Sequence, residues 1–373
     1  MTRPRVVIAG LGDSGLLTAI HLSRHADVVG ISSRPGHVSG QELGVRLTRP
    51  HDWIRDYWIS FDRYRRLDPV RTVHGTLTGL DLDEQIVRVK AADGSASDEP
   101  YDVLVIATGV SNGFWRRPGL LSRDDVAADL EAAHSQLADA TSVAVIGGGA
   151  AAVSSAINLA TTWPDKHVDL FFPNERALPQ HHPKVWSTLS SRLTDLGVGL
   201  HPGYRAVVPE GFDCDRITVD AIEWSTGQDP VSVDAVLWTI GRVRPNTGWL
   251  PGDLLDEHGF VEVDASLRVP GHPGVFAIGD VAATDPLRTS ARNRADKVLA
   301  RNIRADLKGR PLRDYTPRRR RWGSVVGVQS NGLEIFAPNG QAFRFPSWTI
   351  RGLLMGVITR RGIYRGVRGF RSD

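Results

Sequence analysis

Two stretches of the chain share one pattern, in which a short apolar run is followed by glycines and then by small and apolar residues at helical spacing. The first, RVVIAGLGDSGLLTAIHL, begins at Arg5, and the second, VAVIGGGAAAVSSAINLA, spans 143–160. Each run has the length of a buried strand and is followed by signals for a turn and a helix. We predict two strand–turn–helix–strand units, with elements at 5–9, 16–24 and 28–31 and again at 143–146, 150–160 and 168–172.

Three further apolar runs stop at a glycine beside a polar residue. They are YDVLVIATG at 101–109, VDAVLWTIGRVRPN at 233–246 and PGVFAIGDVAA at 273–283. Such glycines indicate the carboxyl ends of strands, where an open α/β sheet binds its ligands. Strands that alternate with helices predict parallel sheets, so the expected fold class is α/β. The loop-like composition around Pro118 and Pro251 places the crossings between two domains near these prolines.

The pattern changes from about Arg318, where RRRRW leads into segments of alternating polarity. The dipeptides Asn331–Gly332 and Asn339–Gly340 are hairpin signals. We predict a small β-rich region over 318–373 that ends in a basic amphipathic segment, WTIRGLLMGVITRRGIYRGVRGF.

The composition limits the chemistry that the chain itself can supply. Of its 373 residues, 41% are hydrophobic and 23% charged, as in a globular protein of two or three domains. The one cysteine, Cys214, excludes an intramolecular disulfide, a Cys-x-x-Cys pair and a thiolate metal cluster, so any redox chemistry must belong to a cofactor. The adjacent His181 and His182 lack the spacing of a helical metal-ligand pair, and we expect a loop role for them and no metal.

The basic charge lies at the C-terminal end. Residues 313–373 hold twelve arginines, no lysine and three acids, a net +9, so a total of +3 leaves −6 for residues 1–312. This asymmetry favours a local anionic partner, such as a phospholipid surface, and argues against nucleic acid. The sequence has neither a signal core nor a run of the ~20 apolar residues that span a bilayer. We expect a cytoplasmic protein, with the inner face of the membrane as the place of any peripheral contact.

The glycines of the first unit fit a dinucleotide-binding turn. In GLGDSG, Gly10 permits the turn, Gly12 lets the backbone approach a pyrophosphate, and Gly15 lets the helix pack closely on the strand. The helix N-terminus, at Asp13 and Ser14, adds about half a positive charge. The alternative is a glycine turn without a ligand, but the strand before the loop and the helix after it favour a dinucleotide.

The second unit repeats these roles with one change. Gly147 and Gly149 take the first two positions, and Ala152, after Ala150 and Ala151, stands where the third glycine would pack, which the pattern tolerates. Two nucleotide sites in one chain indicate two cofactors that react with each other. Hydride transfer from a nicotinamide to a flavin is the simplest such chemistry.

Five motifs between residues 10 and 282 resemble those of flavoproteins with two dinucleotide-binding domains, the superfamily of glutathione-reductase-like enzymes and type II NADH dehydrogenases. They are GLGDSG, ATG at 107–109, GGGAAA, TIGRVRPN at 239–246 and GVFAIGDVA at 274–282. The resemblance implies two Rossmann-like domains, the second inserted in the first. FAD would bind residues 1–115 and 250–317, NAD(P)H would bind residues 116–249, and 318–373 would be a C-terminal appendage.

In that superfamily the Asp of the GD pair bonds the ribityl chain of FAD, which implies this role for Asp280. No catalytic side chain is required, because the flavin carries the chemistry. The expected cofactor-binding residues are Gly10, Gly12, Asp13, Ser14, Gly15, Ser32, Arg34, Leu77, Ala107, Thr108, Gly109, Gly147, Gly149, Ala150, Ala151, Ala152, Arg176, Gly241, Gly279 and Asp280.

Three positions depart from the usual pattern. The strand-end acid that binds the adenosine ribose is replaced by Ser32 on the FAD side and by Phe172 on the NAD(P)H side, and Ser154 replaces a helical Glu. Without an acid at Phe172 a 2′-phosphate is not repelled, and Arg176 offers it a partner, so NADPH is at least as plausible as NADH. Loss of nicotinamide binding is the alternative.

Within the superfamily the missing cysteine pair excludes the disulfide-reductase branch, and the C-terminal segment resembles ferroptosis-suppressor-type and AIF-like quinone reductases. The segment has two main interpretations: an interfacial helix on anionic lipid, or a cap on the protein's own core or on a homodimer interface. Nucleic-acid binding by RRRR comes third. The apolar stripe of the interfacial helix is Ile350, Leu353, Leu354, Val357 and Ile358, and its headgroup-facing arginines are Arg351, Arg360, Arg361, Arg365 and Arg368.

We therefore predict an enzyme that passes hydride from NAD(P)H to FAD and electrons on to a small-molecule acceptor, a quinone in the favoured interpretation. The alternatives are a ferredoxin- or rubredoxin-type reductase and a non-catalytic, redox-sensing flavoprotein that binds a partner.

Overall fold

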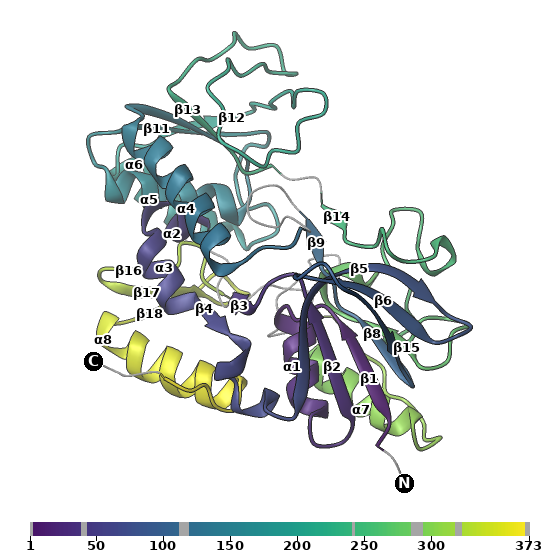
Figure 1. Ribbon diagram of the computed structural model, residues 1–373. Coiled ribbons are helices and arrows are strands. Elements are labelled where there is room, and N and C mark those ends of the chain that lie inside the picture. The colour runs from purple at the N-terminus through teal and green to yellow at the C-terminus, as the bar shows by residue number, and fades with distance from the viewer. Residues whose placement is uncertain are drawn as a thin grey trace.

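A seven-stranded sheet forms the core of one lobe of the computed structural model, and a four-stranded sheet forms the core of the other (Figure 1). The structure describes residues 3–38, 43–111, 119–240, 243–284, 294–317 and 323–369. The larger sheet has the order β15-β8-β1-β2-β5-β6-β7. Its first five strands are parallel, and β6 and β7 continue it antiparallel. Their bounds are β1 Arg5–Ala9, β2 Asp27–Ser32, β5 Val70–Asp81, β6 Ile86–Ala91, β7 Ala96–Pro100, β8 Val103–Ile106 and β15 Val275–Ala277.

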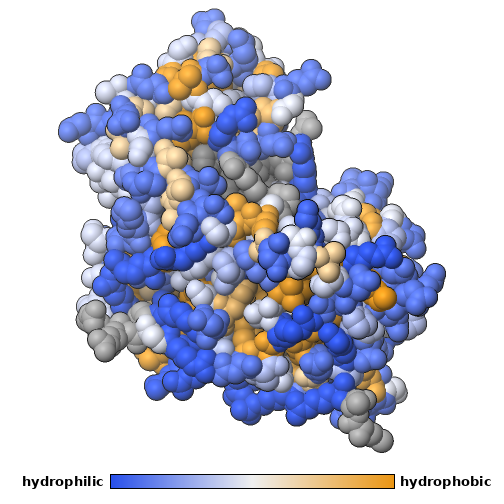
Figure 2. Space-filling model, viewed as in Figure 1, coloured by the Kyte–Doolittle hydropathy of each residue, from blue (hydrophilic) through white to orange (hydrophobic). Residues whose placement is uncertain are grey.

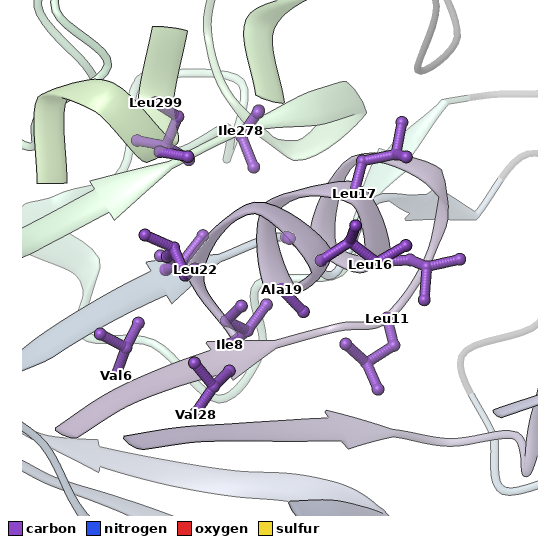
Figure 3. Close-up of a cluster of buried hydrophobic side chains, with 14 of the residues drawn as sticks. Val6, Ile8, Leu11, Leu16, Leu17, Ala19, Leu22, Val28, Ile278 and Leu299 are labelled. Atoms are coloured by element: carbon purple, nitrogen blue, oxygen red, sulfur yellow. The ribbon is translucent and has the colours of Figure 1, made fainter. Parts of the chain in front are cut away.

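The helices α1 (Asp13–Leu22) and α7 (Ala295–Asp306) cover one face of this sheet. Apolar residues of α1 point at those of β1 and β2, and Leu299 and Ile278 close the cluster (Figure 3). Full burial of each large side chain contributes roughly 1.5–3 kcal/mol, so this cluster fixes the helix on the sheet. Helix α1 begins at Asp13, directly after the glycine turn and earlier than the sequence pattern indicated.

The smaller sheet is wholly parallel, in the order β12-β11-β10-β13. It comes from residues between β8 and β15, so the second unit is inserted in the first, and the predicted α/β class with two such units is confirmed. The antiparallel pair β9–β14 lies on the two connections between the sheets. The bounds are β9 Val110–Ser111, α4 Arg123–Asp139, β10 Ser142–Ile146, α5 Ala150–Thr162, β11 His167–Phe172, α6 Pro183–Asp195, β12 Gly199–Pro202, β13 Ala235–Trp238 and β14 Arg244–Pro245.

Short elements after β2 join the lobes. Helix α2 packs on α5 so closely that a Cβ on Gly44 would lie 2.2 Å from the Ser154 carbonyl oxygen. The bounds are β3 Gly36–Val38, α2 Leu43–Thr48, α3 Pro50–Tyr57 and β4 Trp58–Ser60, with single 3₁₀ turns at η1 Phe61–Arg63, η2 Arg65–Leu67, η3 Gly252–Leu254 and η4 Gly279–Val281.

The C-terminal region is an antiparallel three-stranded sheet followed by a helix, and the predicted β-rich appendage is confirmed. Asn331–Gly332 lies at the β16–β17 hairpin and Asn339–Gly340 between β17 and β18. The final helix is wound as a π-helix, since its hydrogen bonds reach back five residues, as from the Tyr364 N–H to the Thr359 carbonyl at 3.0 Å. The bounds are β16 Val328–Gln329, β17 Gly332–Phe336, β18 Ala342–Phe345, α8 Ser347–Thr349 and η6 Ile350–Ile363.

Candidate dinucleotide-binding sites

The carboxyl ends of four parallel strands meet at the first glycine loop. The Gly10 N–H donates to the Ile31 carbonyl, the Ala107 N–H to the Ala9 carbonyl and the Ile278 N–H to the Ile106 carbonyl, all at 2.8–2.9 Å. Residues from four distant segments of the sequence therefore form one edge.

Glycine is required at two of the three loop positions for internal packing. Gly10 has φ +109°, and a Cβ on it would lie 2.3 Å from the Ala107 carbonyl oxygen. A Cβ on Gly15 would lie 1.9 Å from the Gly10 carbonyl oxygen. By contrast, a Cβ on Gly12 would meet nothing within 4 Å, and no side chain caps the N-terminus of α1. The open space beside an uncapped helix N-terminus has the geometry that accepts a pyrophosphate.

The GD motif faces this loop. Gly279 has φ +82°, and a Cβ on it would lie 3.0 Å from the Ser14 hydroxyl oxygen, so the turn that contains Asp280 begins against the first turn of α1. Two residues beyond the end of β8, the Thr108 Oγ1 is buried and has no hydrogen-bond partner among the described residues. An unsatisfied buried hydroxyl at this edge is what a missing polar ligand would leave, so these residues fit a bound dinucleotide.

Asn246 holds the ATG segment, residues 107–109, in place. The sequence did not predict this role; its one signal was that Asn246 ends the TIGRVRPN motif. Its Nδ2 donates to the Thr108 carbonyl and its N–H to the Gly109 carbonyl, both at 3.0 Å. The Ser111 hydroxyl donates to the Asn246 Oδ1 at 2.7 Å. Asn246 thereby ties both connections between the lobes together.

The second loop repeats the geometry of the first. Gly147 has φ +140°, and a Cβ on it would lie 2.4 Å from the Thr239 hydroxyl oxygen. A Cβ on Gly149 would meet nothing within 4 Å, and α5 starts at Ala150 without a side-chain cap. Ala152 is fully buried, whereas Ala150 and Ala151 are partly exposed at the first turn. Gly241, also expected at this site, lies outside the described residues.

The remaining expected residues flank the two loops or lie on β5: Ser32 follows Ile31, whose carbonyl accepts the Gly10 N–H, and Arg176 comes two residues before Leu178, whose N–H donates to the Gly148 carbonyl. Ser32 ends β2, where its hydroxyl accepts the Arg34 N–H at 3.2 Å. Leu77 is on β5 and packs on the core of the larger lobe. Arg176 donates to the carbonyls of Leu178, Pro179 and His181 at 3.3–3.5 Å, so it braces its own loop.

The two unusual residues of the smaller lobe are both buried. Phe172 packs edge-on against Trp186, with 5.3 Å between ring centroids. Ser154 is 1% exposed beneath α2, and its hydroxyl has no hydrogen-bond partner within the described parts of the chain. A glutamate in such a place would require a partner for its charge, which gives a physical reason for the smaller residue. His182 accepts the Lys184 N–H at 3.2 Å and so caps α6.

On the face that Figure 2 shows, hydrophilic residues dominate the rims and apolar residues show between the lobes.

Comparisons with known proteins agree with this geometry. Ferroptosis suppressor protein 1 of Xenopus tropicalis is 27% identical over 327 residues, which cover 84% of this chain and 83% of that protein. The type II NADH:quinone oxidoreductase Ndh of Mycobacterium tuberculosis is 27% identical over 357 residues, covering 82% of this chain and 73% of its own. The solved structure of a ferredoxin reductase from Rhodopseudomonas palustris shares the fold, with a TM-score of 0.63, 20% identity and coverage of 91% and 88%. The profile of one family matches residues 4–300, and the chain therefore belongs to the pyridine nucleotide-disulphide oxidoreductases.

Proposed function

We propose that the protein is a flavin-dependent oxidoreductase with FAD at the Gly10 loop, NAD(P)H at the Gly147 loop and a quinone as electron acceptor. The observation that carries the proposal is the pair of open spaces at Gly12 and Gly149, each beside an uncapped helix N-terminus on its own parallel sheet. A bound flavin takes a hydride from a nicotinamide and returns two electrons to an acceptor.

The chain's own residues would bind and orient the cofactors. The N-termini of α1 and α5 would stabilise the two pyrophosphates, and Asp280 and Thr108 would bond to the FAD at the strand ends. The domain limits at 1–115, 116–249, 250–317 and 318–373 belong to this proposal, with the β9–β14 pair as the crossing.

The quinone is supported by the name of one relative, the type II NADH:quinone oxidoreductase Ndh of Mycobacterium tuberculosis. Cys214 is the chain's one cysteine, so the chain lacks the pair that the disulfide chemistry in the family's name requires. The second candidate is a ferredoxin-type reductase, which the Rhodopseudomonas palustris structure favours. Steady-state assays with soluble quinones and with a ferredoxin separate the two.

We expect that the purified protein binds FAD and that its visible absorbance is bleached under anaerobic conditions by NADH, NADPH or both. Titration of each nucleotide against the flavin absorbance measures this directly and also gives the preference. Because Arg176 already donates to three carbonyls, its contact with a 2′-phosphate would require these bonds to rearrange. Bound FAD that neither nucleotide bleaches contradicts the proposal and leaves the non-catalytic flavoprotein.

The C-terminal segment from Trp348 onward has an exposed apolar surface, and we propose that this surface contacts a lipid membrane. Trp348 is 81% exposed, and Leu353, Val357 and Ile358 of η6 are about half exposed. The other two residues of the predicted stripe face inward: Ile350 is buried against Leu333 and Ile335 of β17, and Leu354, partly buried, packs on the same cluster.

Two of the expected headgroup arginines are engaged elsewhere in the structure. Arg360 is 5% exposed and donates to the Asp56 carbonyl at 3.0 Å, and Arg368 pairs with Asp68. Arg351, Arg361 and Arg365 remain exposed beside the apolar surface. No helix within the described ranges is long and apolar enough to cross a membrane.

We expect the double variant Leu353→Gln/Val357→Gln to lose most of the wild-type binding to anionic vesicles. Each of these side chains is already about half buried, so a membrane would bury only the other half, and removing both costs about 1.5–3 kcal/mol. Co-sedimentation with phosphatidylserine vesicles at low salt measures the effect. The control is Val219→Gln, an exposed valine on the smaller lobe. Unchanged sedimentation of the double variant excludes this surface as the lipid interface.

A further inference from the structure

A short segment after the final helix binds the C-terminal end of the chain to the larger lobe, which holds the Gly10 loop. We name residues 364–369 the C-terminal strap. It runs beside residues 63–68, with the Arg65 N–H donating to the Gly366 carbonyl at 3.1 Å and the Arg368 N–H donating to the Arg63 carbonyl at 2.8 Å. Arg368 also forms a two-pronged ion pair with Asp68, at 2.7 and 2.6 Å. Figure 1 shows η6 and this region lying beside the segment that follows β4.

Tyr364 is the strap's buried residue, at 4% exposure. Its ring packs edge-on against His37 and Tyr64, with 5.4 Å between centroids in both pairs. Its hydroxyl donates to the Asp13 carboxylate at 3.4 Å. The strap therefore reaches the glycine loop of the larger lobe.

His37 completes a buried chain of hydrogen bonds to the same carboxylate. It is 2% exposed, and its Nε2 lies 2.8 Å from Asp13 Oδ1 while its Nδ1 lies 2.9 Å from the Tyr64 hydroxyl. Burial, followed by the nearby Tyr364 and Asp13, raises the pKa of Tyr64 well above its usual value, so this phenol keeps its proton. With Tyr64 donating to Nδ1, a neutral His37 carries its proton on Nε2 and donates it to Asp13.

The position of Asp13 makes this chain of bonds important for a ligand. Asp13 is the first residue of α1 and follows Gly12, whose Cα faces open space. A free carboxylate here would compete with a pyrophosphate for the helix N-terminus and would repel its negative charge. Donors that hold the carboxylate to one side remove that competition.

We propose that Tyr364 and His37 are positioning residues of the cofactor site, which hold the Asp13 carboxylate away from the pyrophosphate position, so that FAD affinity depends on the C-terminal strap. This inference rests on the proposed binding of FAD at the Gly10 loop. It makes the end of the chain part of a site whose other residues lie near its beginning.

The test is a double-mutant cycle on FAD binding, measured as the Kd from titration of the apoprotein with FAD. Tyr364→Phe removes one hydroxyl, and we expect about tenfold weaker binding, since a hydrogen bond to a charged group is lost. Asp13→Asn should bind FAD at least as tightly as the wild type. In the Asp13→Asn background, Tyr364→Phe should change the Kd less than about twofold, because the charge that it controls is gone.

The matched control is Tyr101→Phe. Tyr101 is 5% exposed and precedes β8, at the opposite end of the sheet from the glycine loop, so the Kd of this variant should equal that of the wild type. A wild-type Kd for Tyr364→Phe overturns the inference. The same loss in the wild-type and Asp13→Asn backgrounds also overturns it, because the effect would then be structural.

Two further measurements keep the outcomes separate. If Tyr364→Phe apoprotein is unfolded, Arg368→Ala releases the strap from its exposed end, and an unchanged Kd for that variant overturns the inference. Wild-type protein that binds no FAD overturns the proposed function and this inference together. Wild-type protein that binds FAD without being bleached by a nicotinamide nucleotide contradicts the proposed enzyme alone.

Discussion

Gly12→Val is expected to give a folded protein that has lost FAD. The residue has φ −69° and ψ −172°, a conformation that a β-branched side chain adopts without strain. A Cβ there would meet no protein atom within 4 Å, so the fold gives no reason for glycine at this position. The added methyl groups would instead occupy the place of the pyrophosphate. A loss of about 3 kcal/mol would already weaken the Kd a hundredfold.

The test consists of two measurements on each variant: the FAD Kd of the apoprotein and its thermal midpoint without FAD. Gly10→Ala provides the contrast, because its Cβ would lie 2.3 Å from the Ala107 carbonyl oxygen and its φ is +109°. That variant should lower the thermal midpoint, whereas Gly12→Val should leave it within the error of the wild type. FAD bound by Gly12→Val with wild-type affinity would mean that the loop binds no pyrophosphate.

The sheets and both glycine loops could be predicted because their determinants are local. In each unit the apolar strand, the turn and the helix lie within about twenty consecutive positions, and each glycine role follows from its neighbours in that run. The structure adds the reason for the spacing: Gly10 faces Ala107 and Gly147 faces Thr239, the first residues after the adjacent strands β8 and β13. These two contacts belong to motifs that the sequence already grouped together.

The contacts of the tail could not be predicted, because they join positions at opposite ends of the chain. Tyr364 lies 351 positions from Asp13, and neither segment contains a pattern that indicates the other. The predicted apolar stripe assumes a regular helix, whereas η6 is a π-helix, whose hydrogen bonds reach back five residues. The sequence therefore predicts a headgroup-facing Arg360, whereas in the structure Arg360 is buried and donates to the Asp56 carbonyl.

Ser154 of the smaller lobe is a residue whose meaning the sequence leaves open, and its packing in the structure supplies part of the answer. Ser154 in place of glutamate suggested a lost nicotinamide site. In the structure the residue is covered by α2, whose Gly44 approaches its carbonyl oxygen. Because the Ser154 side chain is 1% exposed, a glutamate there would bury its charge, which favours the smaller residue. The open space at Gly149 is unaffected.

Gly149→Val is expected to keep FAD and to lose reduction by NADH and NADPH. Its φ of −92° and ψ of −178° also suit valine, and a Cβ would meet nothing within 4 Å, so the smaller lobe should fold normally. The side chain would block the N-terminus of α5, where the second pyrophosphate is proposed to bind. We expect kcat/KM for the nicotinamide nucleotide to fall at least about a hundredfold, or roughly 2.7 kcal/mol of transition-state stabilisation.

Anaerobic stopped-flow measurement of flavin bleaching tests this, with dithionite reduction as the control that the bound FAD is intact. Gly12→Val and Gly149→Val are the same substitution in two equivalent loops, and they should fail differently, the first in binding FAD and the second in reducing it. Bleaching of Gly149→Val at the wild-type rate would place nicotinamide binding elsewhere, and it would make the second glycine loop a structural turn, because its open space would then have no ligand.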